Sequence, residues 1–495
     1  MREYSPKRRT ALVFTGSGST GAYHAGALKA LDESGVKLDL VVGSGAGTLA
    51  AAFAAVAGGA RLWGDGGFWH GISFAALYRL RAPLRVAAVL LLAAFVVFLL
   101  PLVLAVLAGL LFPLLLIVDL LAPGWPAGAL SGFEAAPAAL RAPYLAALAA
   151  PVFALSVFAV GALARGYLGE RRRLPERFET LLESERGDKR LRKSLWEVAR
   201  GTALSGPAPP PAELSHKYVA LLLENLGQPG FRELILRAGD LETGRALPFV
   251  LLQDAGRASF AAARARERRS KLDGLTDAVD LKSGEHTALL FDAVRTGLLP
   301  PLVAPPLRMA FPRGGIFSGE THRFTDASLV SGSGLQEAID AGAEQVILVS
   351  GSPEQAGLRP RRRGPLALAD AVLAALERQA LERDLEAAER VNRMVQTLGH
   401  VAEDGTRAWE DPANGRLHRE FTLYVIRPAA RALGPLELDG ALDPTTEVEQ
   451  ALSDLVEQGY RDAYRQFVEP VVGALPEPAR AAEPSVVPEG QPVGL

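Results

Sequence analysis

The chain contains no cysteine among its 495 residues and only three methionines. Disulfides, thiolate metal sites and cysteine nucleophiles are therefore excluded. The seven histidines are scattered and never show the His-Glu-x-x-His spacing of zinc hydrolases, so we expect surface or turn histidines and no metal site. The formal net charge of −2 gives no general attraction to nucleic acid, and we expect neither nucleic acid nor a cofactor as a partner.

Charged residues are also missing from two long stretches. Residues 86–118 form an apolar run of 33 residues, and residues 142–164 form a second run of 23 residues. Apolar runs of about 18 residues or more predict transmembrane helices. As one helix the first run would extend about 50 Å, against about 30 Å of hydrocarbon in a bilayer. Pro101 and Pro113 therefore predict a kinked or tilted helix, with a re-entrant loop as the alternative.

Basic residues flank this pair of runs on both outer sides. They are Arg79, Arg81 and Arg85 before the first run, and Arg165, Arg171, Arg172 and Arg173 after the second. Positive residues favour the cytoplasmic side, so we expect both outer ends in the cytoplasm and the hairpin tip, near residues 120–140, outside. The abundance of Ala, Gly, Leu and Arg is typical of a GC-rich bacterial genome. The sequence thus predicts a protein of the bacterial inner membrane with two transmembrane helices and a cytoplasmic main domain.

Residues 41–47 read Val-Val-Gly-Ser-Gly-Ala-Gly, a strand that runs into a glycine-rich turn. Gly43 and Gly47 occupy the outer positions of a G-x-S-x-G nucleophile elbow, in which the central serine sits on a sharp strand-to-helix turn. The central position here is Gly45, and a helical segment follows over residues 48–56. The pattern predicts an elbow without its hydroxyl.

A second glycine-rich turn lies near the start of the chain. The apolar run of residues 11–14 leads into a loop over residues 15–21 and then into a helical segment over residues 22–34. A strand, a glycine loop and a helix N-terminus direct backbone N–H groups at one point, which suits an oxyanion or a phosphate. The candidate oxyanion residues are Gly16, Ser17, Gly18 and Gly21.

A third turn of small residues carries an aspartate. Asp326 lies within Phe-Thr-Asp-Ala-Ser-Leu-Val, residues 324–330, before an amphipathic segment at 335–341 and a buried-type strand at 345–349. A long amphipathic helix is expected over residues 365–398, and another sheet strand over residues 420–426. Residues 213–285 are expected to be mostly helical.

Together these three turns and their flanks resemble the patatin-like phospholipases. That family carries an oxyanion loop of the type G-G-G-x-[RK]-G, a G-x-S-x-G elbow and a D-G-[GA] aspartate turn. The resemblance covers roughly residues 10–60 and 290–470. It implies an α/β fold, with a patatin-like sheet covered by helices on both faces, and lipid acyl-ester hydrolysis by a Ser-Asp dyad.

The chain departs from the family pattern in each of the three motifs. Ser17 and Thr20 replace a glycine and the basic residue of the first loop, Gly45 replaces the elbow serine, and Ala327 replaces the glycine after Asp326. A dyad needs a nucleophile whose proton the base can take, and glycine has no such atom. Ser44, one residue early, is a poorly placed substitute.

These patterns predict a divided domain. We expect residues 1–75 and 286–474 to form the two segments of the patatin-like domain, and residues 84–166 to form the transmembrane hairpin. Residues 167–285 are expected to form a mainly helical insert or cover, and residues 475–495 a disordered tail.

The leading functional prediction is a protein without hydrolase activity that binds membrane lipid, fatty acid or a protein partner. An acyl hydrolase that uses Asp326 with Ser44 or with water is the alternative, and a structural membrane subunit is a third reading.

Overall fold

The structure is a computed structural model that divides into two compact units, Met1–Tyr78 with Ser184–Leu495 (unit 1) and Arg79–Glu183 (unit 2). Each unit is described by itself. The described residues are 4–121, 144–157 (without 148, 152 and 155), 180–201, 206–267, 278–313, 317–330, 332–354, 365–401, 407–412, 415–429, 433–437, 441–442 and 449–473.

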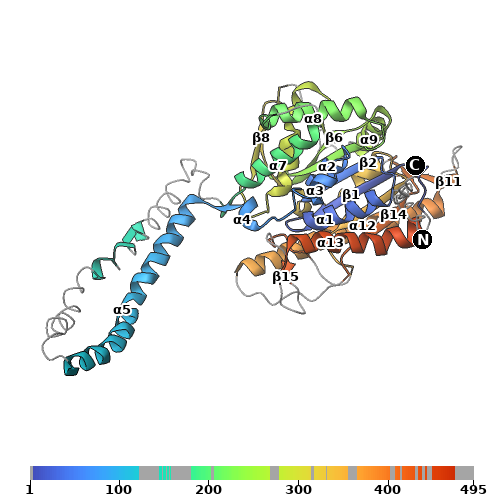
Figure 1. The fold of residues 1–495 in the computed structure, drawn as a ribbon. Coiled ribbons are helices and arrows are strands. Elements are labelled where there is room, and N and C mark those ends of the chain that lie inside the picture. The colour runs from blue at the N-terminus through green and yellow to red at the C-terminus, as the bar shows by residue number, and fades with distance from the viewer. Residues whose placement is uncertain are drawn as a thin grey trace, which may run out of the picture. The chain divides into compact units, whose positions relative to one another are not determined.

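Unit 1 is built on a mixed, mostly parallel sheet with the order β14-β10-β1-β2-β5-β6-β7 (Figure 1). The first five strands in this order run parallel, β6 is antiparallel to β5, and β9 pairs with both β5 and β8. The strands are β1 (Thr10–Gly16), β2 (Leu40–Gly45), β5 (Glu233–Asp240), β6 (Arg245–Leu251), β7 (Val279–Asp280), β8 (Leu307–Ala310), β9 (Thr321–Asp326), β10 (Gln345–Ser350) and β14 (Thr422–Ile426).

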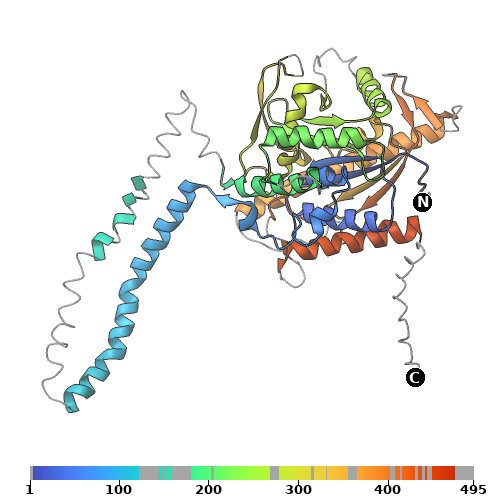
Figure 2. The same cartoon turned by 45° about the horizontal axis from the view of Figure 1, so that its top comes forward.

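Helices cover the sheet, as Figures 1 and 2 show. The α-helices of unit 1 are α1 (Thr20–Glu33), α2 (Gly47–Ala54), α3 (Ala60–Trp63), α4 (Phe74–Leu77), α7 (Glu185–Ala199), α8 (Pro211–Asn225), α9 (Asp254–Glu267), α10 (Leu290–Arg295), α11 (Leu335–Asp340), α12 (Pro365–Leu398) and α13 (Leu452–Ala463). Shorter pieces are η2 (Gly284–Leu289), η3 (Thr296–Leu298), η4 (Ala327–Leu329) and the π-helical η5 (Tyr464–Val472). Small strand pairings are formed by β11 (His400–Val401), β12 (Arg407–Glu410) and β13 (Leu417–Arg419), and by β15 (Ala441–Leu442) and β16 (Glu449–Gln450).

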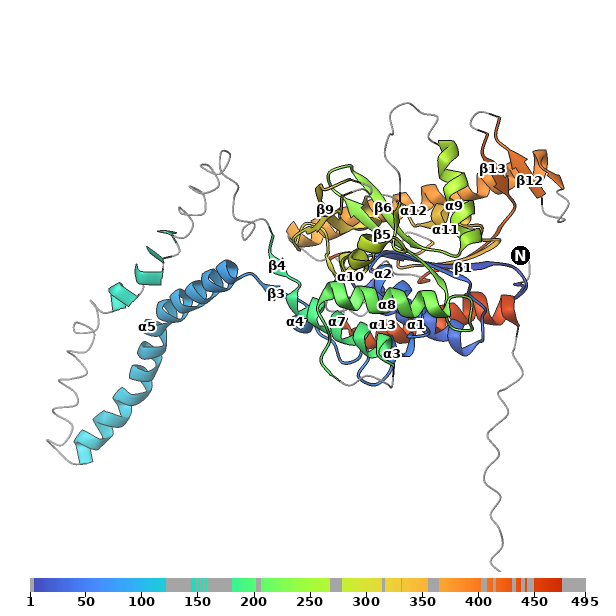
Figure 3. The same cartoon turned by 90° about the horizontal axis from the view of Figure 1, so that it is seen from above.

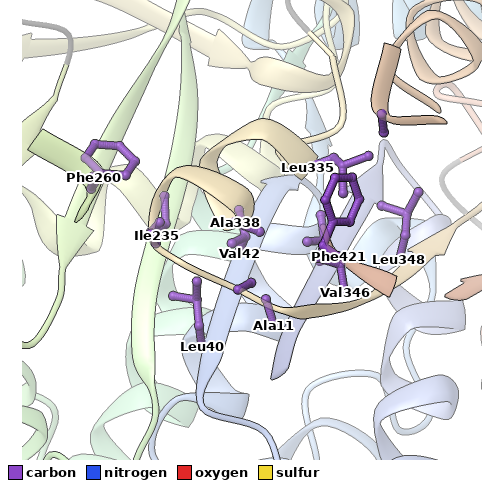
Figure 4. Close-up of a cluster of buried hydrophobic side chains, with 14 of the residues drawn as sticks. Ala11, Leu40, Val42, Ile235, Phe260, Leu335, Ala338, Val346, Leu348 and Phe421 are labelled. Carbon is purple, nitrogen blue, oxygen red and sulfur yellow. The ribbon is translucent and has the colours of Figure 1, made fainter. Parts of the chain in front are cut away.

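The central strands are buried on both faces, which is why their sequences are continuous apolar runs. Alternate side chains of β1, β2 and β10, among them Val13, Val42 and Leu348, pack against α9, α11 and α12 in one core (Figure 4). The opposite side chains of the same strands meet the layer of α1 and α2, and α13 lies beside α1. The mixed α/β class expected from the sequence is confirmed.

Strands β5 and β6 correct the prediction that residues 213–285 are mostly helical. Residues 233–251 were expected to be mostly helical, but they form a strand pair in the main sheet, and β5 is buried along its whole length. The Leu-Ile-Leu run of β5 finds its partners in β2 and in β6, so the tertiary pairing decides its conformation. By contrast, the helix predicted over residues 365–398 is confirmed as α12.

Unit 2 contains α5 (Ala82–Leu121) and the short pair β3 (Arg79–Leu80) and β4 (Leu182–Glu183). Helix α5 continues through Pro101 and Pro113, and within it Leu84–Val103 is long and apolar enough to cross a membrane, with none of that segment buried. The second predicted span, residues 142–164, lies mostly outside the described residues. The predicted hairpin tip at 120–140 and the tail at 475–495 lie almost entirely outside them.

Tyr218 of α8 ties this helix to the end of α2. Its ring is fully buried, and its hydroxyl donates a hydrogen bond to the carbonyl oxygen of Ala52. We expect Tyr218→Phe to lower the free energy of unfolding by about 1–2 kcal/mol, because a buried helix-end carbonyl loses its partner. Thermal denaturation in detergent would measure this, and Tyr464→Phe, at a ring that is 42% exposed, should leave stability unchanged. Equal stability of Tyr218→Phe and the native chain would contradict the prediction.

Candidate functional site

Strand β2 turns into α2 at Gly45, at the carboxyl end of the parallel strands. Gly45 has φ +62°, the left-handed conformation that a glycine adopts without steric cost. It lies opposite Gly16, the last residue of β1, and the N–H of Ala46 donates to the carbonyl oxygen of Gly16 at 2.7 Å. The two glycine-rich turns predicted from the sequence are therefore brought side by side.

No space is left at Gly45 for a side chain. A Cβ atom built there would lie 2.5 Å from the carbonyl oxygen of Gly16, and 2.5 Å and 3.0 Å from the two carboxylate oxygens of Asp326. The carboxylate therefore occupies the position from which a serine side chain would leave the backbone. The predicted aspartate and the predicted nucleophile position are therefore adjacent, but the carboxylate packs against Gly45 and leaves no room for a side chain there.

Asp326 is placed by β9, which runs antiparallel to β5 and pairs Asp326 with Ala238. Its Oδ1 accepts hydrogen bonds from the N–H and the hydroxyl of Ser328, at 2.8 Å and 2.7 Å. The hydroxyl of Ser17 in turn lies 2.5 Å from that of Ser328. The first loop and the aspartate turn are thus joined by a buried Asp-Ser-Ser chain of hydrogen bonds.

The second oxygen of Asp326, Oδ2, has no hydrogen-bond partner within the described part of the chain. Asp326 is only 1% exposed. Burial raises the pKa of its carboxyl to about 6, although hydrogen bonds from Ser328 and Ser17 act in the opposite direction. Such a carboxyl could accept a proton near neutral pH. Gly45, however, has no hydroxyl group from which Asp326 could take one.

In the predicted oxyanion loop, the N–H groups of residues 19–22 donate hydrogen bonds to backbone carbonyl oxygens. Thr20 and Gly21 donate to the carbonyl oxygens of Ser17 and Gly18, at 3.2 Å and 3.3 Å. Ala22 donates to Ser19, whose own N–H donates to Glu437. Gly18 has φ +58°, and a Cβ there would meet the carbonyl oxygen of Pro435 at 2.6 Å. The N–H groups of residues 19–22 therefore already have backbone partners and are not available to an anion.

Ser44, the possible substitute nucleophile, faces another part of the molecule. Its hydroxyl lies 3.4 Å from Nη1 of Arg237, which also donates to the carbonyl oxygen of Gly332 at 2.7 Å. Arg237 is paired with Glu337 at 3.1 Å. A guanidinium cation does not accept a proton from a serine, so this environment does not activate Ser44.

Side chains from other elements close the region around the two turns. A Cβ at Gly21 would meet the ring of Trp69 at 2.4 Å, and a Cβ at Gly297 would meet the carbonyl oxygen of Gly45 at 2.3 Å. Tyr78, the last residue of this segment of unit 1, is also buried. Burial raises its pKa, and the negative charges of Asp188 and Asp326 raise it further. Neither Trp69 nor Tyr78 was singled out from the sequence, since an isolated aromatic residue carries no spacing signal.

Two buried histidines were also missed. His24 is 0% exposed, its Nε2 contacts the carbonyl oxygen of Thr15 at 3.1 Å, and burial lowers its pKa to about 3. His322 is buried between Asp240 and Glu320, at 2.8 Å and 3.1 Å. The expectation of surface or turn histidines is wrong for these two, because the sheet and its cover bury them. Within the described residues no group of side chains is suited to hold a metal ion.

An open cavity lies at the other end of the sheet. Its volume is about 650 Å³, and it is lined near the starts of β2 and β5 by residues that include Lys37, Asp39 and Arg232. The cations there are paired, Lys37 with Asp39 and Arg232 with Asp32. This cavity is separate from the Gly45 region, which lies at the carboxyl ends of the strands.

Comparisons with known proteins give a structural likeness only. No family model matches the sequence, and no curated protein matches it. Solved structures that match include the crystal structure of VipD from Legionella pneumophila, at 12% sequence identity and a TM-score of 0.31; the match covers 93% of this chain and 67% of that chain. A likeness at this level assigns neither a family nor a function.

Proposed function

We propose that this chain is a patatin-like membrane protein that has lost acyl-hydrolase activity and binds a lipid or a protein partner at a bacterial inner membrane. The observation that carries the proposal is the contact between Gly45 and Asp326. The elbow position has no hydroxyl, and the carboxylate lies 2.5 Å from where a Cβ would be. A fold that keeps the strand-to-helix turn, but in which a carboxylate occupies the nucleophile's position, has no place for an acyl-enzyme intermediate.

The neighbouring groups support the same conclusion. Hydrolysis of an ester needs a nucleophile, a base and donors for the developing oxyanion. Ser44 is next to Arg237, and the N–H groups of residues 19–22 already donate to backbone carbonyls. Asp326 is the one predicted catalytic group whose chemistry remains, through its raised pKa.

The membrane part of the proposal is supported by the segment Leu84–Val103, which is apolar and has no buried residue. An exposed apolar helix of this length is costly in water and stable in a bilayer. Together with the second apolar run at residues 142–164, it supports a transmembrane hairpin inserted into a cytoplasmic domain.

Hydrolysis of fluorogenic acyl esters and phospholipids by the detergent-purified chain tests this function. We expect no turnover above background from the native chain, Asp326→Asn or Ser44→Ala. If the native chain turns over substrate and both Asp326→Asn and Ser44→Ala lose this activity, the alternative is established, an acyl hydrolase that uses Asp326 with Ser44. Turnover lost only with Asp326→Asn would indicate a water activated by this carboxyl. An inert chain that co-purifies with one stoichiometric protein would favour the structural subunit over the lipid-binding protein.

A further inference from the structure

The outward face of α12 is apolar in its first three turns and mostly charged in the middle of the helix. In its first three turns the exposed side chains include Leu368, Val372 and Leu376, which are 68%, 50% and 50% exposed. In the middle of the helix the exposed positions are mostly polar or charged and include Gln379, Arg383, Glu386, Glu389 and Arg390, whereas Met394 and Leu398 near its end are again exposed apolar residues. The spacing of four residues places the three apolar side chains in one row. The opposite side of the helix, with Leu373 and Leu381, is buried.

A second exposed apolar side chain lies on a strained backbone. Leu302 is 68% exposed and has φ +68°, a conformation that costs a residue with a side chain free energy. It comes shortly after Gly297, which packs against the carbonyl oxygen of Gly45. We call the three α12 residues Leu368, Val372 and Leu376 the apolar end surface.

Contacts place the first turns of α12 at the end of unit 1 where the parallel strands terminate. Asp370, in the first turns of α12, accepts a hydrogen bond from the N–H of Leu436. The adjacent Glu437 accepts one from Ser19, in the loop after β1. Further along, α12 contacts η4, which directly follows Asp326. Figure 3 shows α12 extended along the unit, and it contacts α11.

The chain leaves unit 1 at the same end. Tyr78, whose pKa responds to the charge of Asp326, is its last residue before unit 2. Only residues 79–83 separate Tyr78 from Leu84, where the apolar span begins. A fully extended chain of this length reaches about 20 Å. The span therefore begins within this length of chain after Tyr78.

We propose that the apolar end surface docks on the lipid bilayer, so that the first three turns of α12 contact the membrane while the charged middle of the helix stays in water. This proposal rests on the membrane anchoring proposed above, and it identifies a lipid surface as the partner. An amphipathic helix with an exposed apolar row binds in the interface of a bilayer. In the sequence, Arg359, Arg361, Arg362 and Arg363 come shortly before this row, and such positive charge favours anionic lipids.

The absence of cysteine makes a direct test simple. The full chain carrying Val372→Cys is labelled with an environment-sensitive fluorophore and reconstituted into phosphatidylcholine vesicles that contain phosphatidylglycerol and brominated acyl chains. We expect emission at shorter wavelength and loss of intensity by bromine quenching. The matched control is Glu386→Cys, an exposed position on the charged part of the same helix, which should remain in water and unquenched.

Flotation of the same vesicles separates the two proposals. If the labelled chain floats with the vesicles after an alkaline wash but position 372 is unquenched, the anchor stands and the docking surface is wrong. Emission at shorter wavelength without bromine quenching would mean that protein, such as a second copy, covers this face, and it would also overturn docking on lipid. A chain that does not float would overturn both the anchoring and the docking. Replacement of Leu368 and Leu376 by Gln should reduce the quenching at position 372 while flotation is retained.

Discussion

Gly45→Ser is expected to gain no hydrolase activity and to lose stability. The left-handed backbone at Gly45 costs a residue with a side chain about 1–3 kcal/mol. The new Cβ would also lie 2.5 Å from the carbonyl oxygen of Gly16, which belongs to the backbone and does not rotate away. Overpacking of this kind costs typically about 1–3 kcal/mol more. Denaturation and ester hydrolysis, measured on the same detergent-purified variant, test the two halves of the prediction.

The matched control is Ala46→Ser, at the neighbouring buried position. Ala46 has φ −57°, which any residue adopts, and the change adds the same hydroxyl one residue later. We expect a smaller loss of stability from Ala46→Ser than from Gly45→Ser. If Gly45→Ser were as stable as the native chain and gained turnover that depends on Asp326, the site would be an intact hydrolase scaffold that lacks one hydroxyl. The conclusion that the Asp326 carboxylate leaves no room for a side chain at position 45 would then be wrong.

Asp326→Asn is expected to stabilise the protein relative to the native chain as pH rises. An asparagine keeps an oxygen that accepts from Ser328, and it removes an ionisable group whose Oδ2 has no partner among the described residues. Burial raises the pKa of the folded carboxyl from 3.8 to about 6, so the folded state binds this proton more tightly than the unfolded state. A difference of about two pH units corresponds to about 3 kcal/mol.

The sign of this effect follows from the raised pKa. Below about pH 4 the carboxyl is protonated in both states and costs nothing. Between about pH 4 and pH 6 the unfolded carboxyl ionises while the folded carboxyl keeps its proton, so the stability of the native chain falls relative to Asp326→Asn; above about pH 6 the difference stays constant. Denaturation of both proteins at pH 4.5 and pH 7.5 measures the change. The control is Asp254→Asn, which removes a carboxyl at a fully exposed side chain. A constant difference between Asp326→Asn and the native chain would indicate that Oδ2 is stabilised by a donor.

Much of the local structure follows from the sequence because it depends on local pattern. The apolar runs of β1 and β10 and the periodicity of α12 are read within a few residues, and each element forms where the pattern predicts it. The pair β5 and β6 was missed, because a strand whose neighbours are β2 and β9 is stabilised by residues far away in the chain. The turns at Gly16 and Gly45 were predicted for the same local reason, because glycine adopts a positive φ without steric cost wherever it occurs.

The sequence by itself determined that no cysteine is available and that Gly45 offers no nucleophile, because these depend only on which atoms the residues carry. The tertiary structure alone decided that Asp326 fills the space at Gly45, that Ser44 faces Arg237 and that the N–H of Ser19 donates to Glu437. Those facts depend on strand register and on the contact of residues hundreds of positions apart, which no local pattern contains. The exposed row on α12 belongs to the same class, since periodicity gives an apolar face but only packing shows which face remains uncovered.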